Sequence, residues 1–125
     1  MTNKIILLVD DEEDIREVAQ LSLEMVGGWQ VITGSSGTEA IAKAEAEKPD
    51  VILLDVMMPD LDGFATFKRL QSNKATQQIP VIFLTAKVTC EDKRRFFELG
   101  VHGVISKPFD PMSLATQVET SLGRL

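Results

Sequence analysis

The chain has 125 residues, of which 44% are hydrophobic, and its formal net charge at pH 7 is −6 with an isoelectric point near 4.7. We therefore expect one packed soluble domain over residues 1–125 rather than a disordered chain, and no direct nucleic-acid binding, which requires a basic face. The chain has a single cysteine, Cys90, and no signal-peptide pattern, so we expect it to be cytoplasmic. No apolar run approaches the roughly 18 residues that span a bilayer, so we do not expect it in a membrane.

Apolar runs alternate with amphipathic segments along the chain, and they predict strands and helices in turn. The first predicted strand runs directly into two aspartates, and the helix after it ends at a glycine pair, which suits a helix stop. The strands are expected over residues 4–9, 29–32, 51–54, 81–84 and 103–106. The helices are expected over residues 12–26, from Ser36 to Pro49, 63–72, 89–99, and from Pro111 onward.

Local signals also predict how three of these helices begin or pack. Ser36 and Glu39 have the spacing of a capping box. Asp110 is expected to cap the last helix, with Pro111 at its first position. The first helix is expected to bury a stripe of apolar side chains at helical spacing: Ile15, Val18, Ala19 and Val26.

Strict alternation of five strands with five helices predicts an α/β fold in three layers, with a parallel five-stranded sheet covered by helices on both faces. The run over residues 51–54 supports this fold, because a central strand that is buried on both faces can be apolar throughout. No linker, repeat or low-complexity stretch interrupts the sequence.

Polar side chains stand where four of the predicted strands end. Asp10 and Asp11 follow the first strand, Asp55 follows the third, Thr85 the fourth and Lys107 the fifth. Because the carboxyl ends of parallel strands share one edge of a sheet, we expect these side chains to converge in one crevice, where open α/β sheets bind their ligands.

The three aspartates supply the hard oxygen ligands that Mg²⁺ prefers. Two carboxylates about 4 Å apart repel each other by roughly 4 kcal/mol at an effective dielectric near 20, so the cluster is expected to hold a cation. Any one of these residues alone could simply cap a helix or a loop. Together with Lys107 they favour a metal and phosphoryl site, since an aspartate such as Asp55 can attack phosphorus and carry an acyl phosphate.

The chain resembles the receiver domain of two-component response regulators in segments that extend from one end to the other. These segments are LVDDE (residues 8–12), DVILLDVMMP (50–59), DG (62–63), PVIFLTA (80–86) and KPF (107–109). The resemblance implies a flavodoxin-like (βα)5 fold with strand order 2-1-3-4-5, and a cis peptide bond between Lys107 and Pro108.

The resemblance also implies roles for the acidic residues. Asp55 corresponds to the phosphoacceptor, and Asp11 and Asp55 to direct ligands of Mg²⁺, with Mn²⁺ as an alternative ion. The Met57 backbone carbonyl corresponds to a third protein ligand, and Asp10 to a residue that acts on the metal largely through water. We further expect Met57 and Lys87, each two residues beyond a strand-end site residue, to shield phosphorylated Asp55 from water.

For the phosphoryl group, the resemblance implies Thr85 as the switch hydroxyl and Lys107 as the binding ammonium, and we add the Ala86 N–H as a further donor. The donor protein is implied to be a histidine kinase or a histidine phosphotransfer protein. Output, and in some receivers homodimer formation, uses the face of the fourth helix, fifth strand and fifth helix. Such a protein catalyses only its own phosphorylation and dephosphorylation.

One position departs from the family pattern. Val104 stands where the family usually has an aromatic ring that rotates inward as the switch hydroxyl moves, and a β-branched side chain cannot sweep as a ring does. Activation is therefore expected either to rest on the Thr85 loop and the fourth helix alone or to be weaker.

Three other classes of protein fit parts of the pattern. A dehalogenase-like phosphatase needs a second aspartate two residues beyond the first, where this chain has Met57, and Asp60 is too far along. A flavodoxin-like electron carrier needs a phosphate loop after the first strand, whereas residues 10–14 are acidic and would repel a phosphate. A phosphorylation-independent receiver that acts only as a binding module stays open as the alternative, although it usually lacks part of the acidic set.

Overall fold

The computed structural model describes residues 4–58, 62–86 and 89–123, and within these ranges five strands and five helices alternate along the chain. The strands are β1 (Ile5–Val9), β2 (Gln30–Gly34), β3 (Val51–Asp55), β4 (Val81–Thr85) and β5 (Gly103–Ser106). The helices are α1 (Glu13–Met25), α2 (Gly37–Glu47), α3 (Gly63–Gln71), α4 (Cys90–Leu99) and α5 (Leu114–Ser121). Each of them overlaps an element that the sequence predicts.

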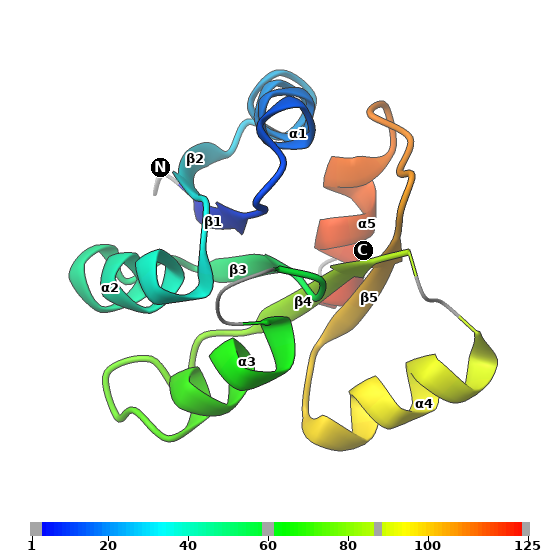
Figure 1. Ribbon diagram of the computed structural model, residues 1–125. Coiled ribbons are helices and arrows are strands. Elements are labelled where there is room, and N and C mark those ends of the chain that lie inside the picture. The colour runs from blue at the N-terminus through cyan, green and yellow to red at the C-terminus, as the bar shows by residue number, and fades with distance from the viewer. Residues whose placement is uncertain (1–3, 59–61, 87–88, 124–125) are drawn as a thin grey trace.

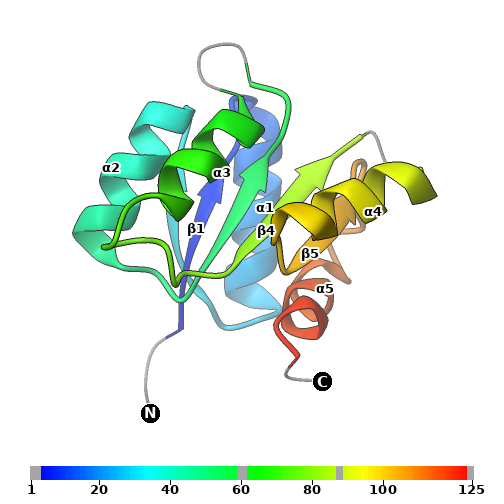
Figure 2. The same ribbon diagram turned by 90° about the horizontal axis from the view of Figure 1, so that it is seen from below.

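The strands form one parallel sheet in the order β2-β1-β3-β4-β5, which confirms the predicted flavodoxin-like α/β fold. Helices α1 and α5 cover one face of the sheet, and α2, α3 and α4 cover the other (Figure 1). The strands point the same way, so their carboxyl ends lie at one edge of the molecule (Figure 2). None of the helices in the described ranges has the length and apolar character that crossing a bilayer requires.

Alternate residues of the central strands enter two separate cores. In β1, Ile6 and Leu8 pack beneath α1 and α5, whereas Leu7 and Val9 pack beneath α2, α3 and α4. All five residues of β3 and of β4 are buried, which is why these strands are apolar without alternation. The core under α3 and α4 is built around Phe83, and the rings around it meet edge-on or tilted: Phe64, Phe67 and Phe96.

The predicted inner stripe of α1 is only partly right. Ala19 is buried, but Val18 and Val26 are nearly half exposed, and the helix buries Ser22 and Leu23 instead. The buried stripe is rotated because α1 packs against α5 and the turn before it, where the Ser22 hydroxyl donates a hydrogen bond to the Pro111 carbonyl. The periodicity of apolar residues in α1 does not predict that α5 packs against it.

The predicted start of the last helix is wrong by about one turn. The Asp110 side chain accepts a hydrogen bond from the Met112 N–H at 2.9 Å, and the Asp110 carbonyl accepts from the Ser113 and Leu114 N–H groups at 3.0 Å each. Asp110 therefore closes a tight turn through Pro111, and α5 begins only at Leu114.

The predicted capping box at the start of α2 is confirmed in one of its two hydrogen bonds. Ser36 accepts from the Glu39 N–H at 3.1 Å as predicted, but the Glu39 carboxylate accepts from the Ser35 N–H rather than from that of Ser36. A complete capping box joins Thr89 and Asp92 at the start of α4, although we did not predict it.

Candidate functional site

The β1 end of the site is a short loop of two aspartates. The Asp10 N–H donates to the Gly34 carbonyl at 3.1 Å, which extends the β1–β2 ladder by one residue and buries Asp10 completely. The Asp10 carboxylate accepts from the Glu12 N–H at 2.9 Å. Asp11 is exposed, so this end of the site offers one buried and one solvent-facing carboxylate.

The β3 end presents Asp55, whose side chain is 2% exposed. Its Oδ1 accepts a hydrogen bond from the Met57 N–H at 3.2 Å. Gly63, the first residue of α3, closes the intervening loop by donating its N–H to the Val56 carbonyl at 2.9 Å. A Cβ at Gly63 would lie 2.6 Å from the Val56 Cα, so only glycine allows α3 to approach the backbone beside Asp55 this closely.

Lys107, which follows the edge strand β5, contacts both Asp10 and Asp55. Its ammonium lies 2.8 Å from Asp10 Oδ2 and 3.3 Å from Asp55 Oδ2. Its N–H donates to the Thr85 carbonyl at 2.9 Å, which continues the β4–β5 pairing and holds the backbone of Lys107 in place. The predicted cis peptide bond between Lys107 and Pro108 is present.

The pKa values reflect this crowding. Burial, with the charge of Asp10, raises the pKa of Asp55 from its ordinary 3.8 to about 6, against the opposing effects of Lys107 and the Met57 N–H. Burial lowers the pKa of Lys107, but the hydrogen bond and charge of Asp10, together with those of Asp55, outweigh it and raise that pKa above its ordinary value. Lys107 is thus held in its charged form.

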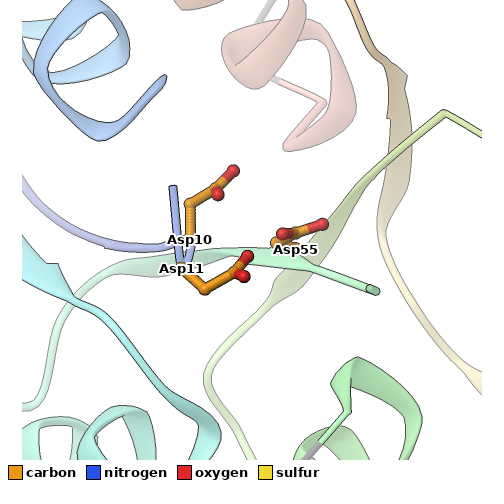
Figure 3. A group of neighbouring side chains, drawn as sticks. All are labelled: Asp10, Asp11 and Asp55. Carbon is orange, nitrogen blue, oxygen red and sulfur yellow. The ribbon is translucent and has the colours of Figure 1, made fainter. Parts of the chain in front are cut away.

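The acidic cluster can hold a metal ion. One oxygen from each of Asp10, Asp11 and Asp55 lies within 4.8 Å of the others, and the three side chains reach into a common space (Figure 3). Three carboxylates and one ammonium leave two negative charges when all are ionised. Within the described ranges, Asp10 Oδ2 is buried with no hydrogen bond beyond its ion pair with Lys107. Hard oxygens, excess negative charge and one solvent-facing ligand fit a divalent cation such as Mg²⁺.

The other residues that we assigned to the site lie around this cluster. Thr85 is buried and lines a pocket of about 660 Å³ between α3 and α4, together with Val56 and Phe96. Ala86 is exposed and lines a different groove, of about 380 Å³, with Lys107. Thr85 and Ala86 are neighbours in sequence, yet they face different cavities beside the site.

Met57 is exposed and lines the same pocket as Thr85. The use of its carbonyl as a metal ligand stays a prediction. Lys87 and Asp60, which the sequence analysis weighed, lie outside the described residues.

Val104 is partly buried and packs against the core that contains Phe83 and Phe96. Of the adjacent rings on α4, Phe96 is buried and Phe97 is half exposed. The aromatic rings that line the pocket of Thr85 are Phe96 of α4 and Phe64 of α3, and position 104 of β5 carries no ring.

Arg16 is a residue near the site that we did not predict. It is the fourth residue of α1, at the end of the first turn, and its Nη1 donates to the Asp10 carbonyl at 2.7 Å. The sequence contains a weak signal, an arginine six residues beyond the aspartate. The periodicity of a helix does not predict that a long side chain bends back toward the preceding loop.

Comparison with known proteins places these observations in a family. Residues 6–119 match the profile of the response regulator receiver domain. Over 122 residues the chain is 47% identical to the alkaline phosphatase synthesis transcriptional regulatory protein PhoP of Bacillus subtilis, covering 98% of this chain and 50% of that protein. Over 124 residues it is 39% identical to the phosphate regulon transcriptional regulatory protein PhoB of Pseudomonas aeruginosa, covering 99% of this chain and 54% of that protein.

Solved structures agree. The chemotaxis response regulator CheY4 of Vibrio cholerae aligns with a TM-score of 0.88 and 32% sequence identity, covering 96% of this chain and 99% of that chain. The chain spans about half the length of the curated relatives it matches. With its acidic pocket, its lysine and a family profile that matches most of its length, this chain belongs to the response regulator receiver domains of two-component signalling.

Proposed function

We propose that the chain accepts a phosphoryl group on Asp55 in a Mg²⁺-dependent reaction, from a histidine kinase or a histidine phosphotransfer protein, and that this switches a protein-interaction surface. The observation that carries the proposal is the position of the Lys107 ammonium, 2.8 Å from Asp10 and 3.3 Å from Asp55 at the edge of the acidic cluster. A partly buried lysine there suits the binding of a transferred anionic group.

In this mechanism an Asp55 carboxylate oxygen attacks phosphorus. The new oxygen–phosphorus bond forms as the phosphorus–nitrogen bond of the donor breaks, and the electron pair of that bond stays on the histidine nitrogen. Asp55 is mostly ionised, and so nucleophilic, above its pKa of about 6. We assign Lys107 to one phosphoryl oxygen, and the Ala86 N–H and the Thr85 hydroxyl to another.

Asp10, Asp11 and Asp55 would hold the metal ion, with the Met57 carbonyl as a further ligand. The ion supplies positive charge that neutralises the phosphoryl oxygens during transfer. Mn²⁺ has the same preference for oxygen ligands and is expected to substitute for Mg²⁺.

Exposed apolar side chains next to the site support the approach of a donor protein. The groove that Ala86 and Lys107 line extends to Ile15 and Val18 on α1. From Val18 an exposed apolar strip continues along α1 and onto the turn before α5: Leu21, Met25, Val26 and Met112. We propose that the phosphodonor docks on this strip, since the strip leads directly to the phosphoryl-binding lysine.

The route from the site to the output surface is proposed to run through α4. Thr85 and Phe96 line the same pocket, so a movement of the Thr85 side chain changes the space available to a ring of α4. Phe97, the neighbour of Phe96, is exposed on α4, on the side that we assign to the output face of α4, β5 and α5. This route does not need an aromatic ring at Val104.

The wider setting is also a proposal. We infer a cytoplasmic protein that acts on a partner protein or an output domain, without direct contact to nucleic acid or membrane. It turns over no separate substrate and catalyses only its own phosphorylation and dephosphorylation. Homodimer formation through the face of α4, β5 and α5 stays open.

Acetyl phosphate with Mg²⁺, followed by intact-mass measurement, tests the proposal. The wild type should gain one phosphoryl group, and Asp55→Asn should gain none. Asp50→Asn is the matched control, because Asp50 directly precedes the same strand. Among the described residues its carboxylate accepts the Ile5 N–H, which an amide oxygen can also do. The control should be phosphorylated like the wild type. A wild type that stays unmodified would favour a phosphorylation-independent binding module.

A further inference from the structure

We propose that Arg16 is a positioning residue for the metal site, which it maintains by holding the peptide group between Asp10 and Asp11. This inference rests on the metal-binding part of the proposed function. It assigns a role to a side chain that touches neither a metal ligand oxygen nor a phosphoryl group.

The contact that carries the inference is strong and local. The Arg16 guanidinium donates to the Asp10 carbonyl oxygen at 2.7 Å, a short distance typical of a charge-assisted hydrogen bond. The Arg16 side chain is half-buried, which limits competition from water. Its own N–H donates to the Glu12 carbonyl at 3.0 Å, so the backbone of Arg16 is fixed in the helix that follows the loop.

The geometry of the peptide group explains why this contact matters for Asp11. A peptide group is planar, so a hydrogen bond that holds the Asp10 carbonyl also sets the position of the Asp11 nitrogen and restrains its Cα. The Asp10 carboxylate has a second restraint, the Glu12 N–H at 2.9 Å. Asp11 is exposed, so its direction toward the cluster depends mainly on the backbone that carries it.

The charge of Arg16 acts against metal binding. A guanidinium bound to the carbonyl of a metal-site residue repels an incoming divalent cation. The helix dipole also disfavours the positive charge of Arg16 itself, because Arg16 lies near the amino end of α1. If Arg16 acted only through its charge, its removal would strengthen Mg²⁺ binding. If it positions Asp11, its removal weakens binding, and the two explanations therefore predict changes of opposite sign.

The test compares Mg²⁺ dissociation constants, measured by isothermal titration calorimetry on the full chain at about pH 8, where Asp55 with its pKa of about 6 is ionised. Arg16→Met keeps an apolar stem and is a good helix former. This variant should bind Mg²⁺ about tenfold more weakly than the wild type, which is the low end of the range for losing a residue that orients metal ligands. Arg94→Met is the matched control, since it removes the same charge from an exposed position on α4. It should leave the dissociation constant close to that of the wild type.

Two further variants complete the test. Arg16→Lys restores one donor and the charge, so it should recover most of the lost Mg²⁺ affinity. If Arg16 had a role in folding alone, its removal would lower the metal-free melting temperature without changing Mg²⁺ affinity. Arg16→Ala, with the strongest helix former at this position, carries the same comparison if Arg16→Met does not fold. Equal or tighter Mg²⁺ binding in either truncated variant would overturn the positioning role alone. A wild type that binds no Mg²⁺ would reject the metal site itself, and this role with it.

Discussion

Charged side chains at the two ends of the sheet differ in how deeply they are buried and in whether their charges balance. At the amino ends of the strands, Lys4 pairs with Glu119 at 3.0 Å, and their side chains are 39% and 17% exposed. At the carboxyl ends, Lys107 is 13% exposed and pairs with two aspartates that are 0% and 2% exposed. One end holds a balanced pair beside water, and the other holds one cation among three carboxylates.

This difference distinguishes an ordinary ion pair near the surface from the cluster that we propose as the metal and phosphoryl site. A surface pair contributes little to folding, because water already solvates both partners. A buried, unbalanced cluster costs stability, and the raised pKa of Asp55 is the sign of that cost. A fold keeps such a cluster where a ligand supplies the missing positive charge. The predictions below test the two ends against each other, from the largest expected effect to the smallest.

The largest effect is expected from removing the cation at the carboxyl end. Lys107→Met should slow phosphorylation by acetyl phosphate about a hundredfold or more, because a preorganised charge at the transferred group is lost. An intact-mass time course with Mg²⁺ measures the rate. Lys4→Met removes the same charge at the amino end and should leave the rate unchanged. Equal rates in wild type and Lys107→Met would remove the basis for assigning this lysine to the reaction.

Mg²⁺ is expected to stabilise only through the carboxyl end. At a hundred times its dissociation constant it should raise the free energy of unfolding by about 2.7 kcal/mol. Urea denaturation with and without Mg²⁺ measures this shift. Asp50→Asn should keep the stabilisation, and Asp55→Asn should lose most of it. Stabilisation that persists in Asp55→Asn would place the bound ion elsewhere.

Without metal, Asp55→Asn should be more stable than the wild type at neutral pH, by on the order of 2 kcal/mol. The folded pKa of Asp55, about 6, lies above its ordinary 3.8, so the folded protein binds the proton more tightly than the unfolded chain. Above pH 6 the wild type therefore carries the full cost of a buried charge, and this cost disappears as the pH falls from about 6 to about 3.8.

Urea denaturation of both proteins in chelator, across this pH range, checks the sign. The advantage of Asp55→Asn should shrink toward acid pH, and Asp50→Asn should show no such trend. An advantage that grows as the pH falls would mean that the charge of Asp55 stabilises the folded protein.

The smallest effect is expected at the amino end. Lys4→Met should destabilise the protein by about 1 kcal/mol, because it removes a partly exposed ion pair and a cation near the Trp29 ring, 4.9 Å from the ring centroid. Urea denaturation followed by tryptophan fluorescence measures the loss. A loss as large as the effect of Mg²⁺ would show that the two ends do not differ in the way described.

The elements that could be predicted are those whose signal is local. All strands in the described ranges were found. Four of them, β1, β3, β4 and β5, contain apolar runs, and the polar residues that end these runs were found with them. The start of α5 was missed because Asp110 can cap a helix or close a turn, and the sequence around it permits both. The inner face of α1 was partly missed because α5, far away in sequence, decides which side is covered.

The site shows the same division. That Asp10, Asp55 and Lys107 meet follows from sequence, because parallel strands must bring their carboxyl ends to one edge. The structure alone revealed that Thr85 lines the pocket beside α4 and that Ala86 lines the groove beside α1. It alone also revealed the hydrogen bond from Arg16 to the Asp10 carbonyl.

The sequence by itself determined the α/β class, the edge of the sheet that carries the chemistry, and the residue types gathered there, because apolar runs and their end residues are set by short-range periodicity. The strand order was predicted only from the resemblance to the receiver family. Only the tertiary structure decided how deeply each charge is buried, which ion pairs form, and how the loop between the two aspartates is held. Those properties depend on contacts between segments distant in the chain and on side-chain directions, which neighbouring residues alone do not specify.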